Sequence, residues 1–277
     1  MRHFAPSRLR ATISSGLIRS TTPKPKTLSP FTAISRSTTT NITNSKPSVT
    51  FTSNIHTSSS SPSSSSSSKM SSTQISANAV LDLIKQRRTY YPLSKDLGSL
   101  TTERINEIVK EALQHVPSSF NSQSNRVVVL LGAEHEKLWD ITTETLKAIV
   151  PEDSFASTAG KMAMFKGAAG TILFFEDETV VKGMQEQFAV YADRFPVWAV
   201  QSDAMLQHTL WVALEAEGLG ANLQHYNPLI DAKVAETWSI PESWKLNAQL
   251  VFGGKTGDAG EKAFGPVEEK FKSFGSA

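Results

Sequence analysis

The chain has 277 residues, a formal net charge of +2 and no cysteine, which excludes disulfides, thiolate nucleophiles and cysteine-based metal sites. The charge is unevenly divided: residues 1–69 hold nine Lys and Arg and no acid, while the rest holds all 26 Asp and Glu and only 19 of the 28 Lys and Arg, a net charge of −7. An acidic part of this size can bury a core and argues against nucleic-acid binding. No apolar run approaches the roughly 20 residues of a membrane-spanning helix, so we expect no transmembrane segment.

The first 69 residues have the composition of a mitochondrial transit peptide, rich in Ser and Thr and free of acids. A basic start is drawn to an anionic, energised membrane surface. The tract Ser58–Ser68 cannot bury apolar surface, and we expect it to be a disordered linker. We therefore predict a presequence and linker over residues 1–69 and one domain over residues 70–277. The alternative is a basic tail without a targeting role and a cytosolic form that starts at Met70.

Apolar periodicity in the first half of the body predicts alternating helices and strands. Helices are expected over residues 76–86, 102–116, 134–150 and 155–166. Buried strands are expected over residues 126–131 and 170–175, which are continuous apolar runs.

The ends of these elements carry recognisable signals. Ser76 can cap the first helix, and Pro117 stops the second. The acids Glu176, Asp177 and Glu178 are expected to open another helix, because negative charge suits its N-terminal end.

The longest helical pattern lies over residues 200–217 and leaves little polar face. A helix that is apolar nearly all round is buried on most sides, which indicates a central or subunit-interface helix. A short strand over residues 221–226, a helix over 228–238, a strand over 246–252 and a charged, aromatic tail over 260–274 complete the chain. Strands separated by longer helices indicate an α+β or α/β three-layer domain.

A polar stretch between the second helix and the first strand is the most distinctive segment. It reads Pro117-Ser118-Ser119-Phe120-Asn121-Ser122-Gln123. Its hydroxyls, amides and free backbone N–H groups could face a flat polar ligand, although an ordinary turn-rich loop has the same composition.

The end of the first helix carries Arg87-Arg88-Thr89. Two guanidiniums suit the negative helix end, and they also suit a phosphate or an anionic ring edge. For an isolated Arg-Arg pair, a solvated basic helix end is the simpler interpretation.

Common catalytic motifs are absent. Gly218-Leu219-Gly220 lacks the third glycine of a dinucleotide fingerprint and follows a helix instead of a strand. Gly254-Lys255-Thr256 lacks the upstream glycine of a phosphate-binding loop. No nucleophile elbow and no zinc-type His spacing occur. If the protein is an enzyme, a cofactor must supply the chemistry.

Five segments in order resemble the FMN-dependent nitroreductase family, in its small fungal and bacterial subgroup, over about residues 76–274. They are Arg87-Arg88-Thr89, Pro117–Gln123, Gly170–Asp177, Gly218–Asn227 and Gly260–Glu269. The resemblance implies an α+β, three-layer nitroreductase-like sandwich with a central mixed sheet and flanking helices. It also implies a homodimer with FMN at the subunit interface, hydride donation by NADH or NADPH, and a ping-pong reduction of a nitroaromatic, quinone or other oxidised acceptor.

The resemblance also assigns site residues. Arg87 and Thr89 would contact the ribityl-phosphate and pyrimidine region, with Arg88 beside them. Ser118, Ser119 and Asn121 would come from the partner subunit, with Gln123 less secure. The backbone of Leu223, Gln224 and His225 would face the flavin, and Lys262, or failing that Lys255, would complete the phosphate pocket.

Some features depart from the family pattern. The stretch continues from Gln123 with Ser124-Asn125 where larger bacterial members have Pro-Trp, and no C-terminal Lys-x-x-Arg pair is evident. A flavin-binding regulatory protein with little turnover is the alternative function on the same fold. The sequence leaves open the physiological acceptor, the choice between NADH and NADPH, and the presequence cleavage site.

Overall fold

The computed structural model describes residues 74–275, so the predicted presequence, the Ser-rich linker and Met70 lie outside the described residues. The helices are α1 Ala77–Gln86, α2 Thr102–His115, α3 Gly132–Lys147, α4 Glu152–Lys166, α5 Glu178–Gln187, α6 Phe195–Ala216 and α7 Asp231–Trp238. The strands are β1 Leu93–Ser94, β2 Asn125–Leu131, β3 Gly170–Asp177, β4 Gly220–Gln224 and β5 Trp244–Lys255. Two short 3-10 helices are η1 Ser119–Asn121 and η2 Ala189–Tyr191.

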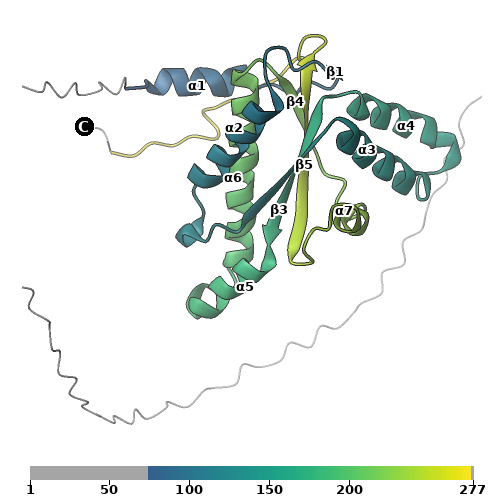
Figure 1. Cartoon of the computed structure of the whole chain (residues 1–277). Helices are drawn as coiled ribbons and strands as arrows, with labels where there is room; N and C mark the ends of the chain where they lie inside the picture. Colours follow the sequence, from purple (N-terminus) through teal and green to yellow (C-terminus); the bar gives the residue numbers. More distant parts are fainter. Residues whose placement is uncertain (1–73, 276–277) are drawn as a thin grey trace, which may run out of the picture. The chain divides into compact units, whose positions relative to one another are not determined.

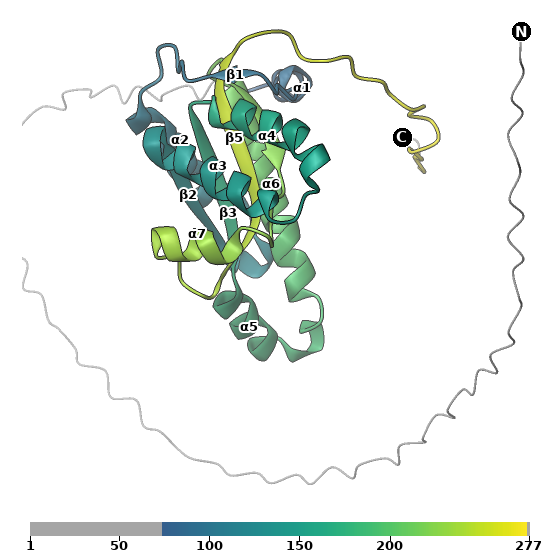
Figure 2. The same cartoon turned by 90° about the vertical axis from the view of Figure 1, so that its right-hand side faces the viewer.

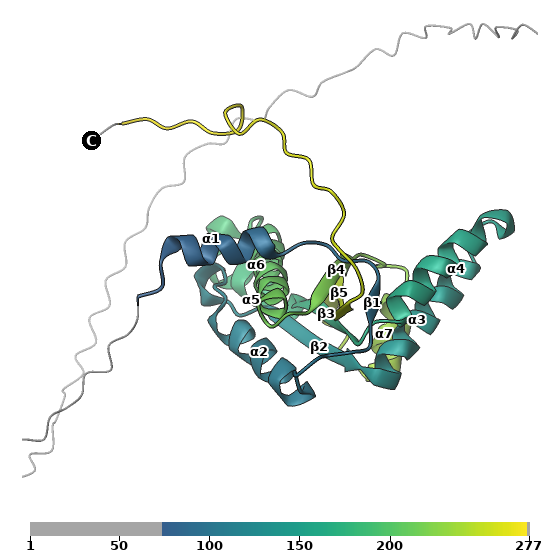
Figure 3. The same cartoon turned by 90° about the horizontal axis from the view of Figure 1, so that it is seen from above.

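The five strands form one sheet in the order β1-β5-β3-β2, with β4 also paired to β5. All named strands pair antiparallel. The resemblance implied a mixed sheet, with both parallel and antiparallel pairs. Among the described residues, the parallel pairing is limited to the isolated bridge between Thr89 and Ala221. Helices α2 and α6 lie on one face of the sheet, and α3, α4 and α7 lie on the other (Figures 1 and 3). The predicted α+β three-layer fold is confirmed.

Strand β3 joins the two halves of the core because its side chains alternate between the faces of the sheet. Ile172 and Phe174 pack toward α2 and α6, while Leu173 and Phe175 pack toward α3, α4 and α7. All eight residues of β3 are buried, as the apolar run Gly170–Phe175 predicts for a strand covered on both faces.

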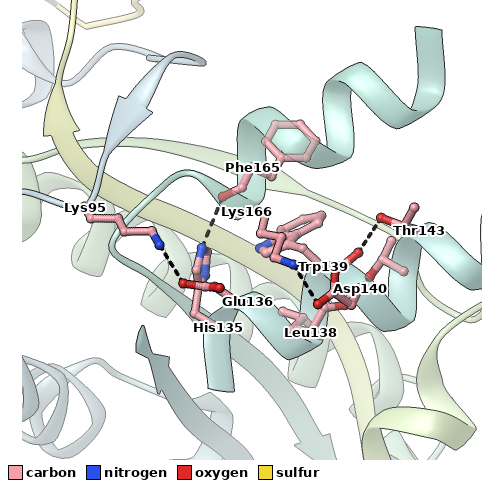
Figure 4. A network of polar contacts seen from close by, with 10 residues as sticks. Lys95, His135, Glu136, Leu138, Trp139, Asp140, Thr143, Phe165 and Lys166 are labelled. Carbon is pink, nitrogen blue, oxygen red and sulfur yellow. Dashed lines mark hydrogen bonds and ion pairs between the residues drawn. The ribbon is translucent and has the colours of Figure 1, made fainter. Parts of the chain in front are cut away.

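On the second face, α3 and α4 lie side by side (Figure 2). A network around the buried side chain of His135 joins them (Figure 4). The imidazole lies 2.9 Å from Thr171 Oγ1 on β3 and 3.1 Å from the Phe165 carbonyl on α4. Trp139 Nε1 donates to the same Thr171 hydroxyl at 3.1 Å. At the surface, Lys166 on α4 pairs with Asp140 on α3.

Several element boundaries differ from the sequence-based expectation, most notably those around α5 and α6. Glu176 and Asp177 extend β3 and do not open a helix; α5 starts at Glu178, with the Asp177 side chain as its N-cap. Helix α6 starts at Phe195, five residues before the apolar pattern becomes clear. Pro196 fits its first turn, where the missing N–H has no helical partner.

Helix α6 is buried on one side only within a single chain. Leu206, Leu210 and Leu214 are fully buried against the sheet, whereas Val197 and Val200 are about half exposed. The exposed apolar face is consistent with the expectation of a subunit-interface helix.

Among residues 74–275, no helix is long and apolar enough to cross a membrane. Within the same residues, no group of three or more His, Cys, Asp or Glu side chains is placed to hold a metal ion.

Candidate functional site

The Arg-Arg-Thr segment and the C-terminal tail line one cavity of about 360 Å³. Arg87 is the C-cap of α1, and the chain leaves the helix there in an extended conformation. Arg88 Nη2 donates to the Gly260 carbonyl of the tail, which keeps the tail beside the two arginines. The cavity is lined by Arg87, Arg88, Thr89, Tyr91, Gly260, Glu261 and Lys262. Three cations around one cavity, offset by one carboxylate, suit an anionic group such as a phosphate.

Residues 87–90, which carry the two arginines, are held by contacts to α6 and β4. The Arg87 guanidinium carbon lies 4.5 Å from the centroid of the Trp211 ring, a cation–π contact to α6. The Tyr90 N–H donates to the Ala221 carbonyl of β4 at 3.0 Å, and Asn222 Nδ2 donates to the Tyr90 carbonyl at 2.8 Å. The segment after α1 is therefore held at the sheet edge and is not a free helix end.

A second cavity of about 370 Å³ lies where β4 ends against α4. It is lined by Tyr91, Lys161, Met164, Phe165, Gln224 and Tyr226. Tyr91 lines both cavities, so they adjoin at this residue. The first has a cationic lining, and the second has aromatic walls. Sequence reasoning did not single out Lys161, since a lone lysine on a weakly patterned helix carries no local signal.

The predicted β4 residues have unequal positions. Gln224 lines the second cavity, and its amide Nε2 donates to Asn222 Oδ1 at 2.9 Å. Leu223 is partly buried against the core, and the side chain of His225 is exposed just beyond the strand. The expected contact of Leu223, Gln224 and His225 with a ligand is made by their backbone, so the positions of their side chains do not test it.

The two candidate lysines differ in their contacts. Lys262 lines the first cavity with the arginines. Lys255 Nζ instead lies 2.6 Å from Glu215 Oε1 on α6 and 4.9 Å from the centroid of the Tyr90 ring, outside that cavity's lining. The Glu215 side chain is only 7 % exposed, so this ion pair holds Lys255 in place. Of the two lysines, Lys262 is therefore the one that lines the cavity with the arginines.

The Ser118–Gln123 stretch lies against the N-terminal half of α6. The Ser119 N–H donates to Ser202 Oγ at 3.4 Å, and the Gln123 N–H donates to Ser118 Oγ at 2.8 Å. Three residues of this stretch have left-handed backbone φ angles: Phe120 at 56°, Asn121 at 52° and Gln123 at 52°. The ring of Phe120 lies in a cluster with Phe188, Tyr191, Phe195 and Trp198.

One chain does not bring these two groups of predicted residues together. The polar stretch contacts α6 at Ser202, whereas Arg87 contacts α6 at Trp211. Nine residues of helix separate these positions, which is about 13 Å along the axis at about 1.5 Å per residue. Within one chain, the two groups therefore contact different parts of α6.

Two buried carboxyls lie between α6 and the end of the sheet. Asn247 Nδ2 donates to Glu176 Oε1 at 2.9 Å and to Asp203 Oδ2 at 3.2 Å. Burial raises the pKa of Asp203 to about 6. Burial, with the nearby Asp203 charge as a lesser cause, raises the pKa of Glu176 to about 7. Asp203 Oδ1 has no hydrogen-bond partner among the described residues, which favours the protonated form further.

Comparison with known proteins gives a consistent result. The model of the nitroreductase family matches residues 84–254. The putative nitroreductase HBN1 of Saccharomyces cerevisiae is 38% identical over 185 residues, which cover 66% of this chain and 92% of that protein. The structure of nitroreductase CinD from Lactococcus lactis in complex with nicotinic acid is 47% identical, covers 70% of this chain and 99% of its own, and has a TM-score of 0.65.

Related structures extend the comparison. CinD has also been solved with chloramphenicol and with 4-nitrophenol, at 47% and 46% identity to this chain. A nitroreductase with bound FMN from Desulfitobacterium hafniense is 17% identical, covers 72% of this chain and all of its own, and has a TM-score of 0.53, a likeness of fold alone.

Proposed function

Because this chain belongs to the nitroreductase family, we propose that it is an FMN-dependent oxidoreductase that uses NADH or NADPH to reduce nitroaromatic, quinone or related acceptors. The observation that carries the proposal is the pair of adjoining cavities that share Tyr91. The family relation supports an oxidoreductase, and the cavities support the cofactor.

The donors around the two cavities fit FMN. Arg87, Arg88 and Lys262 supply charge-assisted hydrogen bonds for the phosphate end. The second cavity has the aromatic and thioether walls that a flat ring requires, with a cation at Lys161. A cation beside a flavin favours the reduced anionic form. The side chain of Gln224 adds an amide at the same wall.

FMN, when bound, accepts a hydride from the reduced nicotinamide and passes reducing equivalents to the acceptor. The chain's own residues bind and orient it. Arg87 and Arg88 hold the anionic end, while Tyr91 and Phe165 exclude water from the flat end. We assign no acid–base residue, because the described lining of the two cavities offers no carboxyl or imidazole apart from Glu261 at the anionic end.

We propose that the functional unit is a homodimer. Large apolar side chains are exposed along α1, α6 and the tail. Exposed apolar surface of this kind typically marks a protein–protein contact. The exposed examples include Val80, Leu81, Val200, Met205, Phe264 and Phe271. In the dimer, Ser118, Ser119 and Asn121 of one copy would complete the flavin site of the other.

The acceptor class is supported by the relatives. CinD has been solved with 4-nitrophenol and with chloramphenicol, and we extend the same class of flat aromatic ligand to this chain. The choice of donor is tested by steady-state oxidation of NADH and NADPH with a nitroaromatic or a quinone present. Acceptor-dependent oxidation supports the enzyme. A flavin-loaded protein that oxidises neither donor would favour a regulatory flavoprotein.

We also propose that residues 1–69 direct the domain formed by residues 70–277 to mitochondria. The support is the acid-free, Arg- and Ser-rich composition. Fractionation of cells that express the full chain, followed by N-terminal sequencing, tests this. A shortened mitochondrial form is expected, whereas a cytosolic form that begins at Met70 would contradict the proposal.

A further inference from the structure

Arg126, at the start of β2, connects three segments that adjoin the Ser118–Gln123 stretch. Its Nη1 donates to the Gln123 carbonyl at 2.8 Å and to the Asn125 carbonyl at 2.9 Å. Its Nη2 donates to Asp177 Oδ2 at 3.0 Å. The other oxygen of Asp177 accepts from the Thr179 N–H at 3.0 Å and caps α5. One guanidinium thus joins the end of the stretch to the start of α5.

The stretch needs such a tie because its backbone is strained. Phe120, Asn121 and Gln123 are all non-glycine residues with φ between 52° and 56°. Asn adopts this conformation readily, but for Phe120 and Gln123 it costs about 1 kcal/mol or more and persists only where the surroundings hold it. The N-terminal side is held by the weak 3.4 Å hydrogen bond to Ser202 and by the packing of Phe120. Arg126 supplies the two-armed contact at the other end.

The helix that Asp177 caps leads to aromatic residues that pack against the stretch. Asp177 caps α5, which leads into η2, and these segments carry Phe188 and Tyr191. The ring of Phe188 lies 4.8 Å from that of Phe120, and the ring of Tyr191 lies 6.1 Å from it. The contact between Arg126 and Asp177 therefore joins the polar stretch to the start of the segment that carries these two aromatic residues.

We propose that Arg126 is a positioning residue of the flavin site, which fixes the hydroxyl and amide groups of Ser118–Gln123 for use by the partner copy. This inference rests on the proposed function. A lysine cannot replace it, because one compact ammonium lacks the planar fork that reaches two carbonyls and a carboxylate together. The side chains of Arg126 and Asp177 are 28% and 12% exposed, so water competes only partly for these contacts.

The test compares four full-chain variants with the wild type: Arg126→Gln, Arg126→Lys, Asp177→Asn and Arg104→Gln. Asp177→Asn removes the same ion pair but leaves both carbonyl contacts and retains a side chain that can cap α5. Arg104 forms two ion pairs away from the stretch and serves as the surface control. For each variant, the FMN dissociation constant, the visible circular dichroism of the bound flavin and the thermal midpoint are measured.

We expect Arg126→Gln and Arg126→Lys to raise the FMN dissociation constant by about tenfold or more and to change the flavin dichroism. Asp177→Asn is expected to stay within about threefold of wild type, and Arg104→Gln to be unchanged. Should Arg126→Gln fail to fold, Arg126→Lys carries the comparison.

Two results would overturn the inference while leaving the proposed function intact. One is a wild-type FMN dissociation constant and dichroism in the foldable Arg126 variant. The other is an equal loss of affinity in Asp177→Asn and Arg126→Gln that follows the loss of thermal midpoint, which would make the role of Arg126 purely structural. A wild-type protein that binds no FMN would instead sink the proposed function, and this inference with it.

Discussion

The guanidinium of Arg87 lies 4.5 Å from the ring centroid of Trp211, and this contact joins the end of α1 to the C-terminal half of α6. One turn further along α6, Glu215 holds Lys255 at 2.6 Å. The C-terminal half of α6 therefore positions one cation that lines the proposed phosphate cavity and holds a second cation outside it.

Replacing Arg87 tests its assignment. Arg87→Ala removes a charge-assisted contact of about 1.5–3 kcal/mol, so FMN affinity should fall by roughly tenfold to a hundredfold. Trp211→Leu keeps the charge but removes the ring that orients it, and a loss of only a few-fold is expected. Titration with FMN followed by flavin fluorescence measures both. Unchanged affinity in Arg87→Ala would show that this arginine does not face the cofactor.

The roles of Lys262 and Lys255 can be distinguished by comparing the affinity for FMN with that for riboflavin, which lacks the phosphate. Lys262→Met is expected to lower FMN affinity about tenfold while riboflavin affinity stays constant, because its ammonium lines the cationic cavity. Lys255→Met should leave the ratio of the two affinities unchanged, since Glu215 already holds that side chain. The reverse pattern would place the phosphate at Lys255.

His135 should make the protein sensitive to acid. Burial lowers the pKa of His135 to about 4 from its ordinary value of 6.5, so the unfolded chain binds a proton that the folded chain rejects in that interval. The free energy of unfolding should therefore fall as the pH drops from about 6.5 to about 4, by on the order of 3 kcal/mol.

Urea unfolding at several pH values measures this dependence. The matched variant His135→Gln should be less stable at pH 8, because it disturbs the contacts to Thr171 and Phe165, but it should lack this part of the pH dependence. Equal slopes in the wild type and the variant would mean that another group accounts for the acid sensitivity.

The buried carboxyls of Asp203 and Glu176 should make the free energy of unfolding depend on pH in the opposite direction. The raised pKa of Asp203, about 6, means that the folded chain retains a proton that the unfolded chain releases above about pH 4. Stability should thus decline as the pH rises from about 4 to about 6. Asp203→Asn should stabilise the protein at pH 8 by on the order of 1–3 kcal/mol and have little effect at pH 4. A destabilised variant at pH 8 would show that the ionised form is the preferred one.

The sequence predicts most elements of the fold because their signals are local. The Ser76 cap, the apolar repeat of α2 and the continuous apolar run of β3 each indicate an element that the structure confirms. The predicted start of a helix at Glu176 is wrong, because acidic residues at a helix N-terminus and at the end of a buried strand look alike in sequence. The two-residue strand β1 and the bridge at Thr89 are too short to have a pattern.

The candidate site is less predictable because it is assembled from distant segments. Arg87 and Lys262 line one cavity although 175 positions separate them in the numbering. Lys161 has no signal at all, since its role follows only from the position of α4 beside β4. The contacts that bind Lys255 to Glu215 are likewise tertiary, which is why both lysines remained candidates from sequence alone.

The most direct test of the central claim is the visible absorption spectrum of the purified full chain, with mass analysis of the ligand released on heating. A yellow protein that releases one FMN per chain is the predicted result, because each copy carries one pair of adjoining cavities. A colourless protein that also fails to bind added FMN would contradict the flavin site and the enzyme built on it.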